Sequence, residues 1–487
     1  MSYLSPKKIL SPKDVQKGLQ MVIWDGLAAE VMTSFTSGTF LVAMALLLGA
    51  TNLQIGLLSA LPLITNLAQL FSVWLVRRYN NRRAVAVFSA YLARIPLLLI
   101  GAGMLWFSSA SVGTLLLFLF FHYLFGSIAG PSWNSWMKDM VPENMLGSYF
   151  SRRSRYTQTL NIVLSLSLAL LLDFVKKDNP GNELNVYAWF FLLGGSAGLI
   201  GGYLLSRAPE PQSYLANADI ISLFKAPLRN FNFRRLLIFN SAWVFAINIA
   251  APFFTVFMMK TMGLPLSYII GLAVLSQLFS ILTLRMWGTF SDRYSNKSII
   301  SISAPLYILC IVAWCFVGIY SRFMNNIGLL ILIHVLTGVS TSGINLALTN
   351  IGLKLASKTE AIVYLSVKNI VTALFSSAGP LVGGMLADFF SQRRLSVTVE
   401  WASPEFNKII RLIALHEWNF LFLIAAMLAL FSMELLMPVK ETGEVSKKVV
   451  RRIMRTSIRT NLKEYFIIGD IISLHEQIWA ILKPRKS

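Results

Sequence analysis

Long apolar segments, separated by short polar or charged breaks, recur along almost the whole chain. Each is about 20 residues long, which is enough to cross roughly 30 Å of hydrocarbon as a helix that rises 1.5 Å per residue. The pattern therefore predicts an all-α integral membrane protein with twelve transmembrane helices in two sets of six. We expect the spans at 21–49, 53–76, 84–108, 112–136, 157–175, 187–206, 236–259, 266–287, 299–320, 327–349, 365–389 and 418–438.

Composition supports this prediction and excludes several other classes of protein. Hydrophobic residues make up 55% of the 487 residues and charged residues 13%, whereas soluble domains carry about 25% charged residues. The net charge of +21 comes from basic residues outside the apolar segments, which argues against a nucleic-acid partner. The two cysteines, Cys310 and Cys315, share one apolar segment and offer no disulfide framework. The polar N-terminus has no pattern of a cleaved signal peptide.

The distribution of Lys and Arg predicts the orientation in the membrane. With twelve spans both termini lie on the same side, so alternate connections can be compared. The connections on the side of the termini hold 34 Lys and Arg residues, and those on the opposite side hold 8. Since basic residues are retained in the cytoplasm, we expect both termini there.

These patterns divide the chain into five parts. We expect a cytoplasmic N-terminal segment, a six-helix bundle, a central cytoplasmic loop, a second six-helix bundle and a basic cytoplasmic tail, at 1–20, 21–206, 207–235, 236–438 and 439–487. Apolar residues recur at helical spacing in the tail, behind a basic stretch. Such a helix is expected to lie along the cytoplasmic membrane face; docking under the bundles is the alternative.

The two halves of the chain resemble each other at a constant offset of 215 residues. Gly56 falls on Gly271 at this offset, and Asp173 falls on Asp388 at the ends of spans 5 and 11. Matches at turns and span ends are harder to obtain by chance than apolar matches inside spans. The halves are therefore expected to be parallel repeats.

Two parallel six-span repeats with a central cytoplasmic loop resemble the major facilitator superfamily of secondary transporters. The segment GTFSDRYSNK after span 8 is similar to a loop motif of that family. The resemblance implies that Gly288 allows close helix approach and that Asp292, Arg293 and Lys297 form a charge network at a cytoplasmic gate.

The corresponding loop of the first half departs from the family motif, with Val73 in place of Gly and Arg77 in place of Asp. The segment NSWMKDMVPENMLGSYFSRR resembles bacterial members of the superfamily, which implies a bacterial inner membrane. The expected second gate network there consists of Asp139, Arg152 and Arg153. The segment GPLVGG at 379–384 resembles an antiporter motif, with ordinary helix packing as its alternative.

The family resemblance implies that spans 1, 4, 7 and 10 line a central cavity. Polar and aromatic residues on these spans are the candidates for binding a solute: Ser34, Ser37, His122, Trp133, Asn248, His334, Thr341 and Asn345. The alternative is that these side chains only form hydrogen bonds within or between helices. The two histidines without nearby carboxylates or thiolates make a poor metal site.

Ionisable residues inside spans are costly and are usually paired or functional. Glu30 and Arg94 each lie about ten residues, or roughly 15 Å, from the cytoplasmic ends of their spans. We expect them to meet, so that a change of partner during transport would load and release a proton at Glu30. Asp25 lies nearer to water and is a further candidate. The alternative is a permanent structural ion pair.

The function that these features favour is proton-coupled secondary active transport of a small organic solute. The expected partners are the solute, protons and the lipid bilayer, with no cofactor, metal or nucleic acid, and the protein is expected to be a monomer. A sensor or receptor with a transporter-like fold and a uniporter without proton coupling are the alternatives. The spans show no nucleophile with its base and no metal cluster, so an enzyme is not expected.

Overall fold

The computed structural model describes most of the chain between residues 6 and 441. The described ranges are 6–7, 10–107, 111–142, 145–212, 227–293, 295–318, 323–355, 361–402 and 407–441. Much of the central loop and the basic tail, whose membrane-surface helix was predicted above, lie outside these ranges.

The structure is almost entirely helical, and its described part contains twelve helices long and apolar enough to cross a membrane. This confirms the predicted number of spans. The first bundle consists of α1 (Pro12–Thr36), α2 (Gly38–Leu47), α3 (Asn52–Thr65), α4 (Gln69–Tyr79), α5 (Arg82–Trp106), α6 (Val112–Met140), α7 (Leu146–Asp178) and α8 (Glu183–Arg207). The second consists of α10 (Phe231–Lys260), α11 (Leu266–Arg293), α12 (Asn296–Ala313), α13 (Phe323–Lys354), α14 (Ala361–Phe390) and α15 (Trp418–Leu436).

The first two spans are interrupted where the sequence predicted continuous helices. In span 1, Ser37 is extended and Gly38 has a φ of +64°, a conformation that glycine adopts without strain. The Ser37 hydroxyl donates to the carbonyl of Thr33 at 2.6 Å at this break. In span 2 a short 3₁₀ turn, Asn66–Ala68, separates α3 from α4. Both spans are therefore built from two helical pieces.

Helix α1 begins earlier than the polarity of the N-terminal segment suggested. Ser11 accepts a hydrogen bond from the backbone N–H of Asp14, whose side chain accepts from the N–H of Ser11. This reciprocal capping, with Pro12 at the first helical position, stabilises a helix start in a polar segment. The expected polar segment at 1–20 is thus helical from Pro12 onward.

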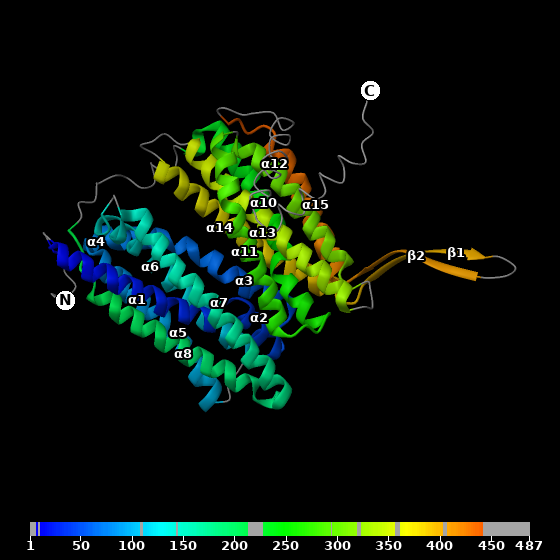
Figure 1. Ribbon diagram of the computed structural model, residues 1–487, viewed down its shortest axis with the longest axis horizontal. Helices are drawn as coiled ribbons and strands as arrows, with labels where there is room; N and C mark the ends of the chain where they lie inside the picture. The colour runs from blue at the N-terminus through cyan, green and yellow to red at the C-terminus, as the bar shows by residue number, and fades with distance from the viewer. Residues whose placement is uncertain are drawn as a thin grey trace, which may run out of the picture.

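The two bundles lie against each other at one end and diverge toward the other (Figure 1). We call the end that carries the N-terminus the terminal end and the opposite one the distal end. In the first bundle α1 packs on α8 and α5 on α6, and in the second α10 packs on α14 and α11 on α13. Between the bundles, α3 packs on α14 and α7 on α11.

A two-stranded antiparallel hairpin stands where the sequence suggested only a connecting loop between spans 11 and 12. Strand β1 (Arg394–Ala402) pairs with β2 (Asn407–His416), with a register shift between Val397 and Thr398. The hairpin projects beyond the distal end (Figure 1). Alternation of apolar and polar residues in RLSVTVEWA was the sequence signal for this strand.

Two aspartates join the bundles at the distal end, and we call each of these contacts a clasp. The carboxylate of Asp173, at the end of α7, accepts hydrogen bonds from the backbone N–H groups of Leu266 (2.8 Å) and Ser267 (2.9 Å), which begin α11. The carboxylate of Asp388, at the end of α14, accepts from the N–H groups of Asn52 (3.2 Å) and Leu53 (2.9 Å), which begin α3. A carboxylate at a helix N-terminus satisfies unpaired N–H groups and the helix dipole. These four hydrogen bonds join the two bundles at the distal end.

Small residues allow the close approach of α3 and α14 beside the Asp388 clasp. A Cβ atom added at Gly384 would lie 2.7 Å from the carbonyl oxygen of Asn52. A Cβ atom at Gly56 would overlap the carbonyl oxygen of Pro380. In this structure the GPLVGG segment therefore packs helices, as the alternative interpretation of that motif proposed.

Candidate functional site

A polar cavity of about 330 Å³ lies inside the first bundle, between α1, α5, α6, α7 and α8. Three charged side chains line it, Asp25, Arg94 and Arg153, together with His122 and Trp133 from span 4. The rest of its wall is mostly alanine, glycine and aliphatic residues. The cavity thus concentrates charge in an otherwise apolar chamber of the size of a small-molecule site.

Arg94 pairs with Asp25 inside this cavity. The Nη2 atom of Arg94 lies 3.5 Å from Oδ1 of Asp25, and both side chains are buried. Glycines of α8 make room for the long arginine, because a Cβ atom at Gly198 would lie only 3.1 Å from Cγ of Arg94. The predicted pair of Arg94 with Glu30 is therefore wrong for this structure.

Glu30 contacts a different helix. Its Oε1 atom accepts a hydrogen bond from the side-chain amide of Asn161 on α7 at 2.8 Å, and the same amide donates to the hydroxyl of Ser34 at 3.1 Å. Five residues along a helix rotate a side chain by about 140°. Asp25 consequently faces α5 and α8 while Glu30 faces α7, although both lie on α1. Glu30 and Arg94 were expected to meet at one depth, but Arg94 meets Asp25, five residues earlier on α1, and rotation about the helix axis turns Glu30 toward α7.

Arg153 enters the cavity from α7. Its guanidinium carbon lies 5.1 Å from the centre of the Trp133 ring, and its Nε atom donates to the carbonyl of Val22 at 3.5 Å. Gly26 provides the space, since a Cβ atom there would lie 2.7 Å from Nε of Arg153. The predicted gate network placed Arg153 with Asp139 and Arg152, and this arrangement is not present. Arg152 is exposed on the other face of α7.

Both candidate histidines form hydrogen bonds to backbone carbonyls. Nδ1 of His122 lies 2.7 Å from the oxygen of Ala93, and Nδ1 of His334 lies 2.8 Å from the oxygen of Leu330. A carbonyl only accepts, so Nδ1 carries the proton in each ring and Nε2 remains for other contacts. His122 lines the cavity, whereas His334 packs edge-on against Trp314 at 5.7 Å.

The remaining cavity candidates show local bonding in this structure. Thr341 donates to the carbonyl of Thr337 at 2.7 Å, and Asn248 donates to that of Val244 at 2.7 Å. Asn345 is exposed. For Thr341 and Asn248 the alternative of hydrogen bonding within the helix describes the observed contacts, and a role in solute binding stays a prediction.

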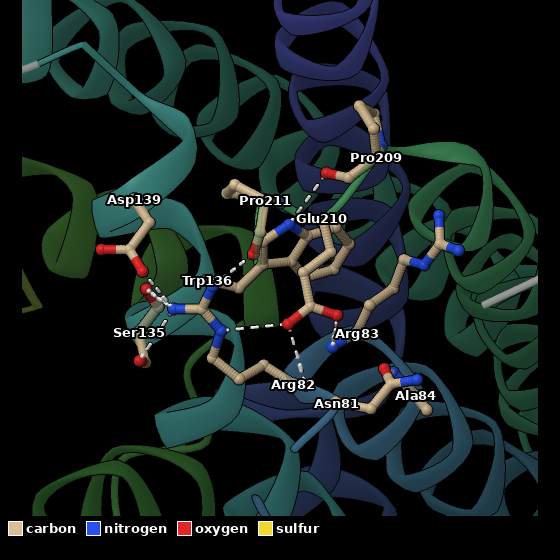
Figure 2. Close-up of polar contacts among 10 residues, drawn as sticks. All are labelled: Asn81, Arg82, Arg83, Ala84, Ser135, Trp136, Asp139, Pro209, Glu210 and Pro211. Atoms are coloured by element: carbon tan, nitrogen blue, oxygen red, sulfur yellow. Dashed lines mark hydrogen bonds and ion pairs between the residues drawn. The ribbon is translucent and has the colours of Figure 1, made fainter. Parts of the chain in front are cut away.

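A charge network built on the buried side chains of Arg82 and Glu210 ties together the terminal end of the first bundle (Figure 2). The carboxylate of Glu210 accepts from the backbone N–H groups of Arg82 and Arg83, each at 3.0 Å, and from Nε of Arg82 at 3.0 Å. Nη1 of Arg82 reaches Asp139 on α6 at 2.5 Å. The indole of Trp136 donates to the carbonyl of Pro209 at 3.0 Å beside it. Asp139 therefore does belong to a charge network, but its partner is Arg82.

Glu441 occupies the matching place in the second bundle. It accepts from the backbone N–H groups of Asn296 (3.1 Å) and Lys297 (2.8 Å) at the start of α12, and from the hydroxyl of Ser295 at 2.8 Å. Nζ of Lys354 lies 3.1 Å from it. Burial alone would raise the pKa of Glu441, but these hydrogen bonds outweigh it and hold the pKa below its usual value. In each bundle, then, a glutamate after the last span caps the third span.

The residues of the predicted second-half gate are only partly described. Lys297 contributes its backbone N–H to Glu441, and its Nζ donates to the carbonyl of Met437 at 3.0 Å. A Cβ atom at Gly288 would meet no described heavy atom within 4 Å. The close helix approach predicted at Gly288 is therefore wrong for this structure. The side chains of Asp292 and Arg293 lie outside the described residues.

Sequence reasoning missed Arg82, Asn161, Glu210, Glu441 and Lys368. The glutamates gave no signal because their main partners are backbone N–H groups, which every residue type except proline carries. Asn161 and Lys368 interrupt apolar segments, and this was the available signal. Among the described residues, no three His, Cys, Asp or Glu side chains come close enough to hold a metal ion.

Comparison with known proteins identifies the family. The family model of the Major Facilitator Superfamily matches residues 26–351 and 276–482. A mutant of the nucleoside transporter NupG is similar in structure, with 13% identity, a TM-score of 0.66, and coverage of 88% of this chain and 100% of that one. The inward-open xylose transporter XylE from E. coli has 14% identity, a TM-score of 0.58, and coverage of 90% and 98%. A POT family transporter in complex with 5-aminolevulinic acid has 13% identity, a TM-score of 0.60, and coverage of 88% and 96%.

No curated protein matches the chain at a significant level in sequence. The family model nevertheless covers most of the chain, and the twelve helices and the fold agree with it. The chain belongs to the Major Facilitator Superfamily.

Proposed function

We propose that this protein is a secondary active transporter that moves a small organic solute across the membrane by alternating access, coupled to protons. The observation that carries the proposal is the combination of a closed distal end with a charged cavity inside the first bundle. The clasps of Asp173 and Asp388 hold the bundles together at the distal end. The closure also includes the packing of α3 on α14 and of α7 on α11, and in the proposed cycle these contacts and the four hydrogen bonds break together when the distal end opens. Family members similar in fold transport nucleosides and xylose.

The proposed orientation places both termini in the cytoplasm of a bacterial cell, in the inner membrane. The distal end is then extracellular, and the structure is a state closed to the outside. The bias of 34 against 8 basic residues supports this orientation. Cysteines introduced in the 390–417 connection should react with an impermeant maleimide from outside, and cysteines in the 137–156 connection should not. The reverse pattern would refute the orientation.

Glu30 is the proposed carrier of the coupling proton. It is half-buried, its hydrogen-bond partner is the neutral amide of Asn161, and no described basic group lies within ion-pair distance of it. A carboxyl group in these surroundings can keep its amide contact in either protonation state. Asp25, in contrast, is held by the guanidinium of Arg94.

The test uses purified protein in liposomes on a solid-supported membrane, with a panel of nucleosides, sugars and organic acids. A transported solute should produce a proton-dependent current. With that solute, Glu30→Gln should abolish uptake driven by a pH gradient while exchange of labelled solute continues, because exchange moves no net proton. Glu434→Gln, an exposed carboxylate on α15, is the matched control and should behave as wild type.

Each alternative predicts a different result in the same assay. Equal loss of driven uptake and exchange in Glu30→Gln would refute the coupling role. Solute flux without any proton dependence would identify a uniporter. Binding of a solute without flux would identify a receptor.

A further inference from the structure

The cavity of the first bundle holds more positive than negative charge. Its described lining includes Arg94 and Arg153 as bases and Asp25 as the acid. Asp25 forms an ion pair with Arg94. Arg153 interacts electrostatically with both Asp25 and Glu30, but among the described residues it forms no ion pair, and its hydrogen bond is to one carbonyl at 3.5 Å, beside the ring of Trp133. A guanidinium has five N–H donors, so most of the hydrogen-bonding capacity of Arg153 is unused by the protein.

The second bundle places a cation at the equivalent position. The repeat offset of 215 brings Arg153 onto Lys368 and Trp133 onto Leu348. Nζ of Lys368 donates to the carbonyl of Leu348 at 2.7 Å, and the residue is 8% exposed. Lys368 likewise has no carboxylate partner among the described residues. Each bundle thus carries one such basic side chain, on α7 or α14, against α6 or α13.

Cations inside a membrane protein are expensive unless an anion balances them. Neither Arg153 nor Lys368 forms an ion pair among the described residues, and Arg153 lines the cavity, where its unused N–H donors can bind an anion. If these two basic side chains had only a structural role, pairing each with a carboxylate or replacing it with an apolar residue would cost less free energy. The unused donors of Arg153 in the cavity are therefore available to an anion that comes from outside the protein.

We propose that the transported solute is a small organic acid with a single carboxylate and an apolar body. The carboxylate binds Arg153, with Arg94 in the same cavity wall, and the apolar body lies against Trp133. The inference rests on the proposed transport function and names its substrate class. A planar carboxylate matches the two parallel donors of a guanidinium. Asp25 keeps one negative charge in the cavity, which disfavours phosphate and other dianions, and the alanine and glycine walls favour an apolar body.

The binding test is thermal unfolding of the full-length protein in detergent, with matched pairs of probes at constant ionic strength. Each pair compares an acid with its neutral amide: phenylacetate with phenylacetamide, and butyrate with butyramide. Inorganic phosphate tests whether a dianion binds. An acid that binds the folded state raises Tm, and the concentration dependence gives its Kd. We expect both acids, or the aromatic one alone, to raise Tm, and the amides and phosphate to leave it unchanged.

Three variants assign the effect to Arg153. Arg153→Gln should weaken acid binding tenfold or more, because it removes a charged hydrogen-bond donor. Arg153→Lys keeps the positive charge but loses the two parallel N–H donors of the guanidinium, so its Kd for acids should lie between those of the wild type and Arg153→Gln. Arg155→Gln changes the net charge by the same amount at an exposed position of the same helix, and it should bind acids as the wild type does.

The proposal is overturned if no acid raises Tm, if acids and amides do so equally, if phosphate binds as tightly as the acids, or if Arg153→Gln keeps the preference for acids. Spin labels at Asn185 and Thr261, described below, report distal opening without any ligand. Opening without acid binding would refute the substrate class alone. Acid binding in a protein that never opens at the distal end would refute transport alone.

Discussion

Removing the charge of the two clasps should open the distal end. In Asp388→Asn and Asp173→Asn the side chain keeps its size and one acceptor oxygen, but each helix N-terminus loses a negative charge and one of two hydrogen bonds. Hydrogen bonds to charged groups contribute about 1.5–3 kcal/mol, and a charge at a helix terminus about 0.3–1 kcal/mol. We therefore expect each substitution to destabilise the distally closed state by about 2 kcal/mol, a shift of roughly 30-fold in the equilibrium.

The two clasps contact different helices, so their effects should add. The double variant should then shift the equilibrium by about 4 kcal/mol, which is roughly a thousandfold. A state that is rare in the wild-type protein would become the main one.

Spin labels on the two bundles can measure this opening. Asn185, at the start of α8, and Thr261, after the end of α10, are exposed at the distal end of different bundles. The native Cys310 and Cys315 are buried, so labelling at introduced cysteines should be selective. Pulsed electron paramagnetic resonance should show a longer distance between these labels in each clasp variant and mainly the longer distance in the double variant.

A nearby aspartate provides the control. Asp178 ends α7 in an exposed position, and Asp178→Asn removes the same charge without touching a clasp. If the distance distribution of the clasp variants matched that of Asp178→Asn, the clasps would not hold the distal end closed.

Other substitutions separate stability from opening. Glu441→Gln should lower the stability of the second bundle by about 2 kcal/mol at pH 7. The folded-state pKa of Glu441 lies below its ordinary 4.5. The stabilisation that the ionised carboxylate provides is therefore complete above about pH 5 and is lost as the pH falls through the folded-state pKa. The difference in Tm between the variant and the wild type should close on acidification, and a difference independent of pH would contradict this. Gly56→Ala should favour distal opening with normal folded yield, because its new methyl group meets the carbonyl of Pro380 in the other bundle. Gly338→Ala meets the carbonyl of Ser276 within one bundle, so it should reduce folded yield without changing the label distance, and the reverse pattern would show that the two contacts are misassigned.

The spans could be predicted from the sequence because hydrocarbon imposes length and polarity on every helix that crosses it. The repeat offset also identified Asp173 and Asp388 as equivalent. Their partners could not be predicted, since these are backbone N–H groups, and no side-chain pattern marks which helix start will face a carboxylate.

The candidate site was predicted only in part. Asp25, Glu30 and Arg94 were recognised because charges in apolar spans are conspicuous. In this structure Arg94 pairs with Asp25 instead of Glu30, because the packing of α1 against α5, α7 and α8 fixes which neighbour each side chain meets, and sequence spacing does not show that packing. Arg153 was expected at a gate with Arg152 because their segment resembles bacterial members of the superfamily, but a turn of about 100° per residue sends these neighbours to different faces of α7.

The clasps also have a consequence for how such a chain could have arisen. In each half, the aspartate at the end of the fifth span contacts the start of the second span in the other half. The same contact therefore occurs twice, and the two copies are related by an approximate two-fold axis. This is the arrangement of an isologous interface, in which two identical six-helix chains would satisfy each other completely. In such a dimer one substitution would alter both contacts at once. Fusion into a single chain lets Asp173 and Asp388 vary separately, so that the two sides of the closure can be weakened to different extents.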